Sequence, residues 1–223
     1  QDPVAGLLVS TGLPDGLVGQ WHLDDSAGIY ALDSSTYGFL GTLQNNPSWV
    51  TGKRGQALSF NGVNQYVNIP DNAALRPGTS QGWTMQVWFN ATAGLNQNAH
   101  ILSKRQEGGT YAKFAIAFCG DSSCITSGQR LAAHDRYYDD TKRYMVTPGS
   151  YADGLWHHAA LVRNGTITTL YVDGLAQASA TSASTPNINT ADPLQIGNGN
   201  GALYFNGKID EARVYNVARS STQ

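Results

Sequence analysis

Short runs of strand-forming residues recur along this chain at intervals of about 8 to 15 residues, and turn residues close each run. The closing residues are Gly, Asn-Gly, Asp-Gly or Pro, and apolar residues nowhere keep a helical period over three turns. The acidic residues agree with this pattern, because only Glu107 and Glu211 are glutamates and aspartate favours turns over helices. The sequence therefore predicts an all-β protein with many turns.

The strand candidates are numerous enough to specify an architecture. The run 83–90 places four apolar side chains on one face and polar or aromatic ones on the other, and Asn164-Gly165 predicts a hairpin between two further runs. The clearest candidates are residues 17–23, 57–60, 65–69, 83–90, 101–104, 111–118, 156–163, 166–173, 193–197 and 208–215. So many strands would curl or split as one open sheet, so we expect a two-sheet antiparallel β-sandwich.

The chain has 223 residues and no internal linker, which predicts one large domain. We assign residues 1–15 to an N-terminal lead-in arm, residues 16–219 to the domain and residues 220–223 to a tail. The sequence begins at Gln1 rather than Met, so we expect a processed or excised piece of a larger chain or assembly.

The charge balance excludes some classes of partner. Lys and Arg number 14 against 16 Asp and Glu, and charged residues make up only 13% of the chain. A protein that binds nucleic acid or an anionic membrane surface would show a basic excess. No apolar stretch approaches the roughly 18 residues of a membrane span, so we expect no direct membrane insertion either.

The two cysteines, Cys119 and Cys124, lie in FCGDSSCI with four small or polar residues between them. This spacing suits a short loop closed by a disulfide, which would place the protein in an oxidising, extracellular or cell-surface compartment. The alternative is two unpaired thiols in a cytosolic protein.

Several segments together resemble the LamG-like jelly-roll family of the concanavalin A-like lectin and glucanase superfamily. They occur in the family's order over residues 16–219: GLVGQWHLDDSAGIYALDSS, TGKRGQALSFNGVNQYVNIPD, WTMQVWF, ILSKR, LWHHAALVRNGTITTLYVDG, LQIGN and FNGKIDEARVYNVA. The resemblance implies a jelly roll whose first and last strands are neighbours. Its members include sugar-binding modules, adhesin domains and accessory domains of enzymes and pilins, so the fold does not fix the function.

The resemblance also implies a structural calcium ion. It suggests Asp24 and Asp210 as side-chain ligands, with backbone carbonyls near Asn61 and Asp33 completing the shell. The alternative is that Asp24 and Asp210 cap turns or form salt bridges, with Arg213 as an obvious partner. Two departures weaken the ion site: the family's Gly-Asn-Gly after Asp33 is Thr36-Tyr37-Gly38 here, and Asn64-Gln65 replace an acidic pair.

Catalytic signatures are weak. The clustered carboxylates of the superfamily's glucanases are absent, and the G-x-S-x-G match around Ser80 lacks the strand before it and the helix after it. His157 and His158 are consecutive and point to opposite faces of a strand, and His22, His100 and His134 have no spaced partner for a metal. We therefore expect no enzyme activity.

The segment 119–151 lies outside the recognised motifs and carries the residues best suited to ligand binding. Tyrosine rings can stack on a pyranose while charged groups bind its hydroxyls. The same residues would also suit a protein contact, or a hairpin that merely covers the edge of the sandwich. The candidate ligand-binding residues are His134, Arg136, Tyr137, Tyr138, Asp139 and Arg143.

These observations predict a non-catalytic, calcium-stabilised extracellular recognition module that binds a glycan or a cell-surface protein ligand. The alternative is a structural or adhesive assembly domain of a larger surface, filament or pilin-type protein, with no small-molecule site.

Overall fold

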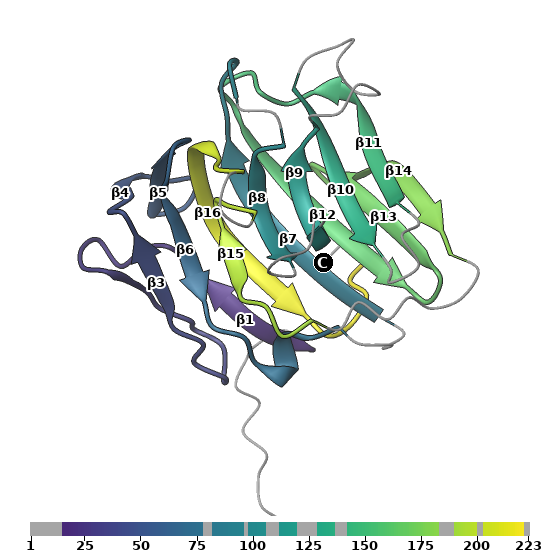
Figure 1. The fold of residues 1–223 in the computed structure, drawn as a ribbon, viewed down its shortest axis with the longest axis horizontal. Coiled ribbons are helices and arrows are strands. Elements are labelled where there is room, and N and C mark those ends of the chain that lie inside the picture. Colours follow the sequence, from purple (N-terminus) through teal and green to yellow (C-terminus); the bar gives the residue numbers. More distant parts are fainter. Residues whose placement is uncertain are drawn as a thin grey trace, which may run out of the picture.

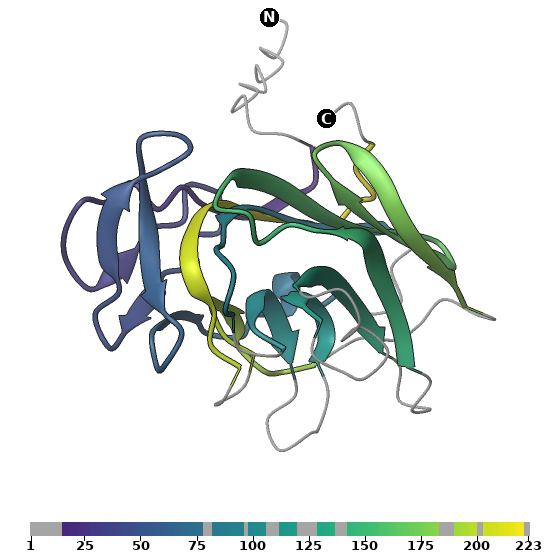
Figure 2. The ribbon, with the colours of Figure 1, turned by 90° about the horizontal axis from the view of Figure 1, so that it is seen from above.

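The computed structural model describes residues 15–77, 82–95, 98–105, 112–119, 129–136, 142–182, 190–199 and 203–220. They form two antiparallel eight-stranded sheets stacked face to face (Figures 1 and 2). The one helix among them is the short η1 (Ala73–Leu75), so no helix in these ranges could span a membrane. The predicted all-β sandwich is confirmed.

Sheet A has the strand order β14-β13-β12-β7-β16-β5-β4, with β1 paired to β16. Its strands are β1 (Leu17–Trp21), β4 (Ser48–Thr51), β5 (Gln56–Asn61), β7 (Gly82–Asn90), β12 (Trp156–Asn164), β13 (Ile167–Val172), β14 (Leu175–Thr181) and β16 (Asn206–Tyr215). The pairing of β1 with β16 places the first and last strands side by side, as the family resemblance implies.

Sheet B has the order β11-β10-β9-β8-β15-β6-β3-β2. Its strands are β2 (Tyr30–Ala31), β3 (Gly41–Gln44), β6 (Tyr66–Ile69), β8 (His100–Arg105), β9 (Ala112–Phe118), β10 (Arg130–Arg136), β11 (Lys142–Ser150) and β15 (Leu194–Ile196). All ten strands expected from the sequence are present, with ends that differ by one or two residues. Six further strands carry no clear apolar alternation and were not expected: β2, β3, β4, β10, β11 and β14.

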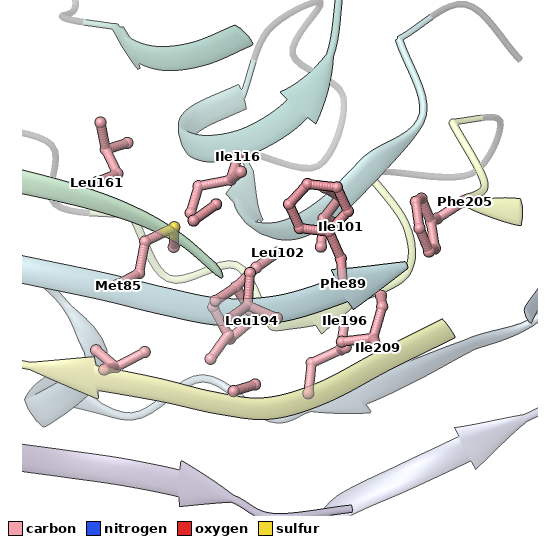
Figure 3. Close-up of a cluster of buried hydrophobic side chains, with 14 of the residues drawn as sticks. Met85, Phe89, Ile101, Leu102, Ile116, Leu161, Leu194, Ile196, Phe205 and Ile209 are labelled. Carbon is pink, nitrogen blue, oxygen red and sulfur yellow. The ribbon is translucent and has the colours of Figure 1, made fainter. Parts of the chain in front are cut away.

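The core lies between the two sheets. Trp83, Met85, Val87 and Phe89 of β7 are at most 1% exposed, which confirms the apolar face expected for this run. Figure 3 shows Met85 and Phe89 packed with side chains of sheet B such as Ile116. The expected hairpin joins β12 to β13, and Gly165 has the positive φ of 58° that this turn requires.

An irregularity in β16 bears on function. The register between β16 and β7 shifts between Asp210 and Arg213, and Glu211 takes a positive φ of 52°. A bulge of this kind lets consecutive residues leave the simple in-and-out alternation. Asp210 and Glu211 are both buried as a result, at 0% and 4% exposure.

Candidate functional site

A row of polar residues crosses sheet B on its outer face. Thr42 of β3 pairs with Asn68 of β6, Asn68 pairs with Gln195 of β15, and Gln195 pairs with Ser103 of β8. The residues that flank them along the strands, such as Val67 and Leu194, are buried in the core. Because side chains alternate along a strand, the row must face away from the core.

Three amides in this region form a hydrogen-bonded chain. Gln195 Nε2 donates to Asn68 Oδ1 at 3.4 Å, and Asn198 Nδ2 donates to Gln195 Oε1 at 3.3 Å. Ser103 Oγ donates to the Asn198 carbonyl at 2.7 Å, and Asn198 is only 1% exposed. The chain is therefore held firmly at Asn198, while Asn68 and Gln195 remain half-buried at the surface.

Two tyrosine rings lie beside the amides. Tyr66 precedes Asn68 by two residues and so shares its face, and its ring centroid is 6.2 Å from that of Tyr204. Burial, and to a lesser degree the proximity of Tyr204, raises the pKa of the Tyr66 hydroxyl, so it stays protonated at neutral pH. We call Tyr66, Asn68, Gln195, Asn198 and Tyr204 the tyrosine–amide site.

A second polar region, the β1–β16 cluster, consists of Gln20, His22, Asp24, Glu211 and Arg213. His22 Nδ1 lies 2.9 Å from Glu211 Oε1, and Arg213 forms an ion pair with the same carboxylate. The potential ligand atoms of His22, Asp24 and Glu211 lie within 4.8 Å of one another. His22 has no spaced partner in the sequence, and the fold brings Glu211, which is 189 residues away, beside it.

Asp24 and Asp210 both bind the turn at residues 52–56. Asp210 Oδ2 accepts hydrogen bonds from the backbone N–H groups of Lys53 and Arg54 at 2.8 and 2.9 Å. Asp24 Oδ1 accepts one from the Gln56 N–H. These bonds agree with the alternative in which Asp24 and Asp210 cap a turn. Arg213, however, pairs with Glu211 and not with either aspartate.

The other oxygen of Asp210 makes the calcium hypothesis testable. Asp210 Oδ1 is buried and accepts no hydrogen bond from any described residue. Burial, together with the nearby Glu211 and Asp24 carboxylates, raises the pKa of Asp210 to about 6, against two backbone hydrogen bonds that lower it. A buried acceptor with negative neighbours suits a cation, and carboxylate oxygens are the ligands that calcium prefers.

Asn61 does not join this pair, and the Asp33 carboxylate is engaged by backbone N–H groups. Asn61 pairs with Asn206, four residues from Asp210 along β16, which is about 13 Å and too far to share an ion. Asp33 bridges to Trp21, and its two carboxylate oxygens accept bonds from the Gln20, Ser35 and Phe39 N–H groups. The register therefore removes Asn61 from the expected shell, and a backbone carbonyl near Asp33 stays a prediction.

The ligand-binding residues expected in 134–143 are only partly described. His134 lies on the outer face of sheet B, opposite Ala115 of the neighbouring strand, and its ring packs edge-on against Tyr144 with centroids 4.4 Å apart. Arg136 and Arg143 lie in β10 and β11, where only their backbone is described. Tyr137, Tyr138 and Asp139 lie outside the described residues, so their role stays a prediction.

The predicted disulfide falls in the same part of the chain. Cys119 follows β9, and its N–H donates to the Arg130 carbonyl at 2.9 Å. Cys124 lies outside the described residues, so the bond between them stays a prediction.

A small pocket lies on the outer face of sheet A. Its volume of about 50 Å³ has room for only a few water molecules. Two of its polar groups are already bonded: Thr84 Oγ1 donates to the Val217 carbonyl and Gln86 Nε2 to the Tyr215 hydroxyl. The lining residues include Thr84, Gln86, His158, Ala160, Tyr171 and Arg219.

Sequence reasoning missed the tyrosine–amide site. The alternation in QYVNI and LQI does show that Tyr66, Asn68 and Gln195 leave the core face. It does not show that they are neighbours, because Asn68 and Gln195 are 127 residues apart in sequence.

Comparison with known proteins agrees with the observed jelly roll. A family model described as the concanavalin A-like lectin/glucanases superfamily matches residues 61–223. The chain belongs to this superfamily. A sequence search of curated proteins finds no match.

Solved structures of the same fold come from proteins of several kinds. Domain 4 of AbnA, a GH43 extracellular arabinanase from Geobacillus stearothermophilus solved with arabinotriose, has a TM-score of 0.70 at 18% identity and covers 93% of this chain and 95% of its own. The binding domain of Paraclostridial Mosquitocidal Protein 1 has a TM-score of 0.75 at 13% identity and covers 93% of this chain. The binding domain of Botulinum neurotoxin DC, solved with rat synaptotagmin II, has a TM-score of 0.70 at 9% identity, again over 93%. The superfamily member described here spans about half the length of these two toxin domains, 50% and 49%.

Proposed function

We propose that this jelly roll is a non-catalytic binding module that holds a neutral glycan at the tyrosine–amide site. The observation that carries the proposal is the hydrogen-bonded chain of Asn68, Gln195 and Asn198 beside the Tyr66 and Tyr204 rings, on the outer face of a sheet.

The chemistry of the site suits a sugar. Each sugar hydroxyl both donates and accepts a hydrogen bond, and each side-chain amide offers a donor and an acceptor. An aromatic ring can cover the apolar face of a pyranose or furanose while the amides select among its hydroxyls. None of the five site residues is acidic or basic, which favours a neutral glycan over an acidic one.

The buried glutamate supports a role without catalysis. Glu211 is 4% exposed and is engaged by both His22 and Arg213, so its carboxylate is not presented to a substrate. A retaining glycosidase needs two carboxyl groups of its own, about 5 to 5.5 Å apart, that flank the bond to be cleaved. Glu107, the other glutamate, lies outside the described residues.

The test is a glycan array of the purified protein, followed by calorimetric titration of the best neutral oligosaccharide. We expect Tyr66→Ala and Gln195→Ala to weaken binding about tenfold or more. Tyr66→Ala removes a stacking ring, and Gln195→Ala removes an amide that can bond to sugar hydroxyls. Tyr171→Ala is the matched control, since Tyr171 is also half-buried but lies on sheet A. Equal losses in all three variants would contradict the assignment, and an array without signal would favour the structural or assembly domain.

We also propose that calcium binds at Asp24 and Asp210 and that the module works outside the cell. An ion there would satisfy the buried Asp210 Oδ1 and offset the repulsion among Asp24, Asp210 and Glu211. We expect millimolar calcium to raise the melting temperature and chelator to lower it, because a ligand that binds only the folded state stabilises it. The Asp24→Asn variant should lose this response, and an unchanged wild-type melt would contradict calcium binding.

A further inference from the structure

A group of large apolar side chains is exposed at one end of sheet B. Of the nine large hydrophobic residues that are exposed among the described residues, five fall within residues 29–40. Their exposed fractions range from 41% to 58%, and we call them the apolar patch: Ile29, Tyr30, Leu32, Tyr37 and Leu40. Single exposed hydrophobic residues need no explanation, but such a concentration marks an interaction surface.

Strand register brings part of the patch onto one face. Ala31 of β2 pairs with Gly41 of β3, and both point inward, where a side chain at Gly41 would meet Val67 at 2.7 Å. Tyr30 pairs with Thr42. Leu32 directly follows Ala31, and Leu40 directly precedes Gly41. Because residues on either side of an inward-facing residue point outward, Tyr30, Leu32 and Leu40 lie on the outward side, where all three are exposed.

Hydrogen bonds and a ring contact hold the turn that carries Tyr37. The Asp33 carboxylate accepts bonds from the N–H groups of Ser35 and Phe39, both at 2.8 Å. The Phe39 carbonyl accepts a bond from the indole N–H of the fully buried Trp21, and Tyr37 stacks on the Phe39 ring with centroids 5.2 Å apart. The patch is therefore preorganised, which lowers the entropy that binding would cost.

The charges around the patch restrict what can cover it. Residues 15–52 contain four aspartates and no lysine or arginine. Asp25 lies at the patch itself, where its carboxylate accepts the Leu32 N–H at 3.2 Å. The first basic residue, Lys53, directs its ammonium onto the Trp88 ring of sheet A. An anionic membrane would be repelled, and two copies packed patch to patch would bring their aspartates together.

From this combination we infer that the apolar patch docks another protein, whose own contact face is apolar with lysine or arginine at its rim. Tyr and aliphatic side chains with few charges are typical of the centre of a protein interface, and opposite charges at the rim set orientation. The contact uses side chains and not strand addition, because the edge strand β2 has only two residues. This inference is independent of the glycan proposal.

The experiment uses two amphipathic helical peptides as probes, one of leucine and lysine and one of leucine and glutamate, with binding followed by fluorescence anisotropy. We expect the wild-type protein to bind the leucine–lysine peptide, and Leu32→Ser/Leu40→Ser to bind it about tenfold more weakly. Ile167→Ser/Leu175→Ser is the matched control, because it removes two exposed hydrophobic residues of sheet A. Thermal melts of both variants establish that they fold.

Other results would overturn the inference. Equal binding of the leucine–glutamate peptide, no binding of the leucine–lysine peptide, or equal loss in the control would each contradict it. Flotation with phosphatidylcholine vesicles that depends on Leu32 and Leu40 would assign the patch to a membrane. Self-association in sedimentation velocity that the Leu32→Ser/Leu40→Ser variant abolishes would assign it to a second copy of this chain.

Discussion

The outer faces of the two sheets use polar residues in opposite ways. On sheet A, Glu211 binds His22 and Arg213, Gln86 binds Tyr215, and Thr84 binds the Val217 carbonyl, so these groups are paired within the protein. On sheet B, Asn68 and Gln195 are half-buried, and their amides bond to each other at the surface of the sheet.

The difference separates polar groups that stabilise a fold from those that can bind a ligand. A buried pair gives little affinity for anything else, because breaking it would leave a charge or dipole without a partner. A half-buried amide that is held in place at the surface can exchange water for a sugar hydroxyl at small cost. On this ground we propose the glycan site on sheet B and a structural role for the outer face of sheet A.

The strongest test of the contrast removes the charge of Glu211. We expect Glu211→Gln to lower the free energy of unfolding by about 2 to 3 kcal/mol, because Arg213 would lose its carboxylate partner in a largely buried cluster. Urea denaturation would measure this, with exposed Asp15→Asn as the control. Glycan affinity should not change, and a large loss of affinity would break the assignment of the cluster to structure.

A smaller effect on stability is expected when Asp210 is replaced and the pH is varied. Its raised pKa means that the folded protein binds the proton more tightly, so the contribution of Asp210 to stability is greatest below pH 4 and falls as pH rises through about 6. In chelator, Asp210→Asn should therefore gain about 1 to 2 kcal/mol over wild type at pH 7.5 and nothing at pH 3.5. Thermal melts across this range would check it.

Adding calcium to the same two proteins tests whether the ion binds Asp210. If the ion binds Asp210, the advantage of Asp210→Asn at pH 7.5 should disappear or reverse when calcium is added, because the ion stabilises only the charged carboxylate. An advantage that persists in calcium would show that Asp210 only caps the turn at residues 52–56.

The same substitution on each sheet tests the comparison directly. Gln195→Ala should weaken glycan binding about tenfold and change stability by less than about 1 kcal/mol, since Gln195 is half-buried. Gln86→Ala on sheet A should leave affinity unchanged, because Gln86 is 8% exposed and bonded to Tyr215. Calorimetry with the same oligosaccharide would compare them, and matching losses would contradict a site on sheet B.

The smallest effect is expected at an exposed contact of sheet A. His157 lies between Asp173 at 2.8 Å and Asp153 at 3.2 Å. A backbone hydrogen bond from Leu155, with a further contribution from His157, lowers the pKa of Asp153. The contribution of ionised Asp153 to stability is thus fully present above the ordinary aspartate pKa of about 4. It is lost as pH falls through the lowered pKa of the folded protein. Asp153→Asn should cost less than about 1 kcal/mol at pH 7 and nothing near pH 2, and a constant difference would contradict the charge effect.

The strands that sequence predicted differ from those it missed in one physical respect. The run 83–90 alternates strictly, so one face had to be buried, and it is. The strand β14 has no fully buried residue, and β2 has only two residues, so neither carries a hydrophobic period. Both are edge strands that depend on neighbours already in place.

The sequence alone determined the all-β class, the family, the hairpin at Asn164-Gly165 and the outward direction of Tyr66 and Asn68, because these follow from local alternation and turn chemistry. Only the tertiary structure decided that Asn68 meets Gln195, that His22 meets Glu211, and that Asn61 lies far from Asp210. Those contacts depend on strand order and register, which are set by packing of the whole core and not by any local segment.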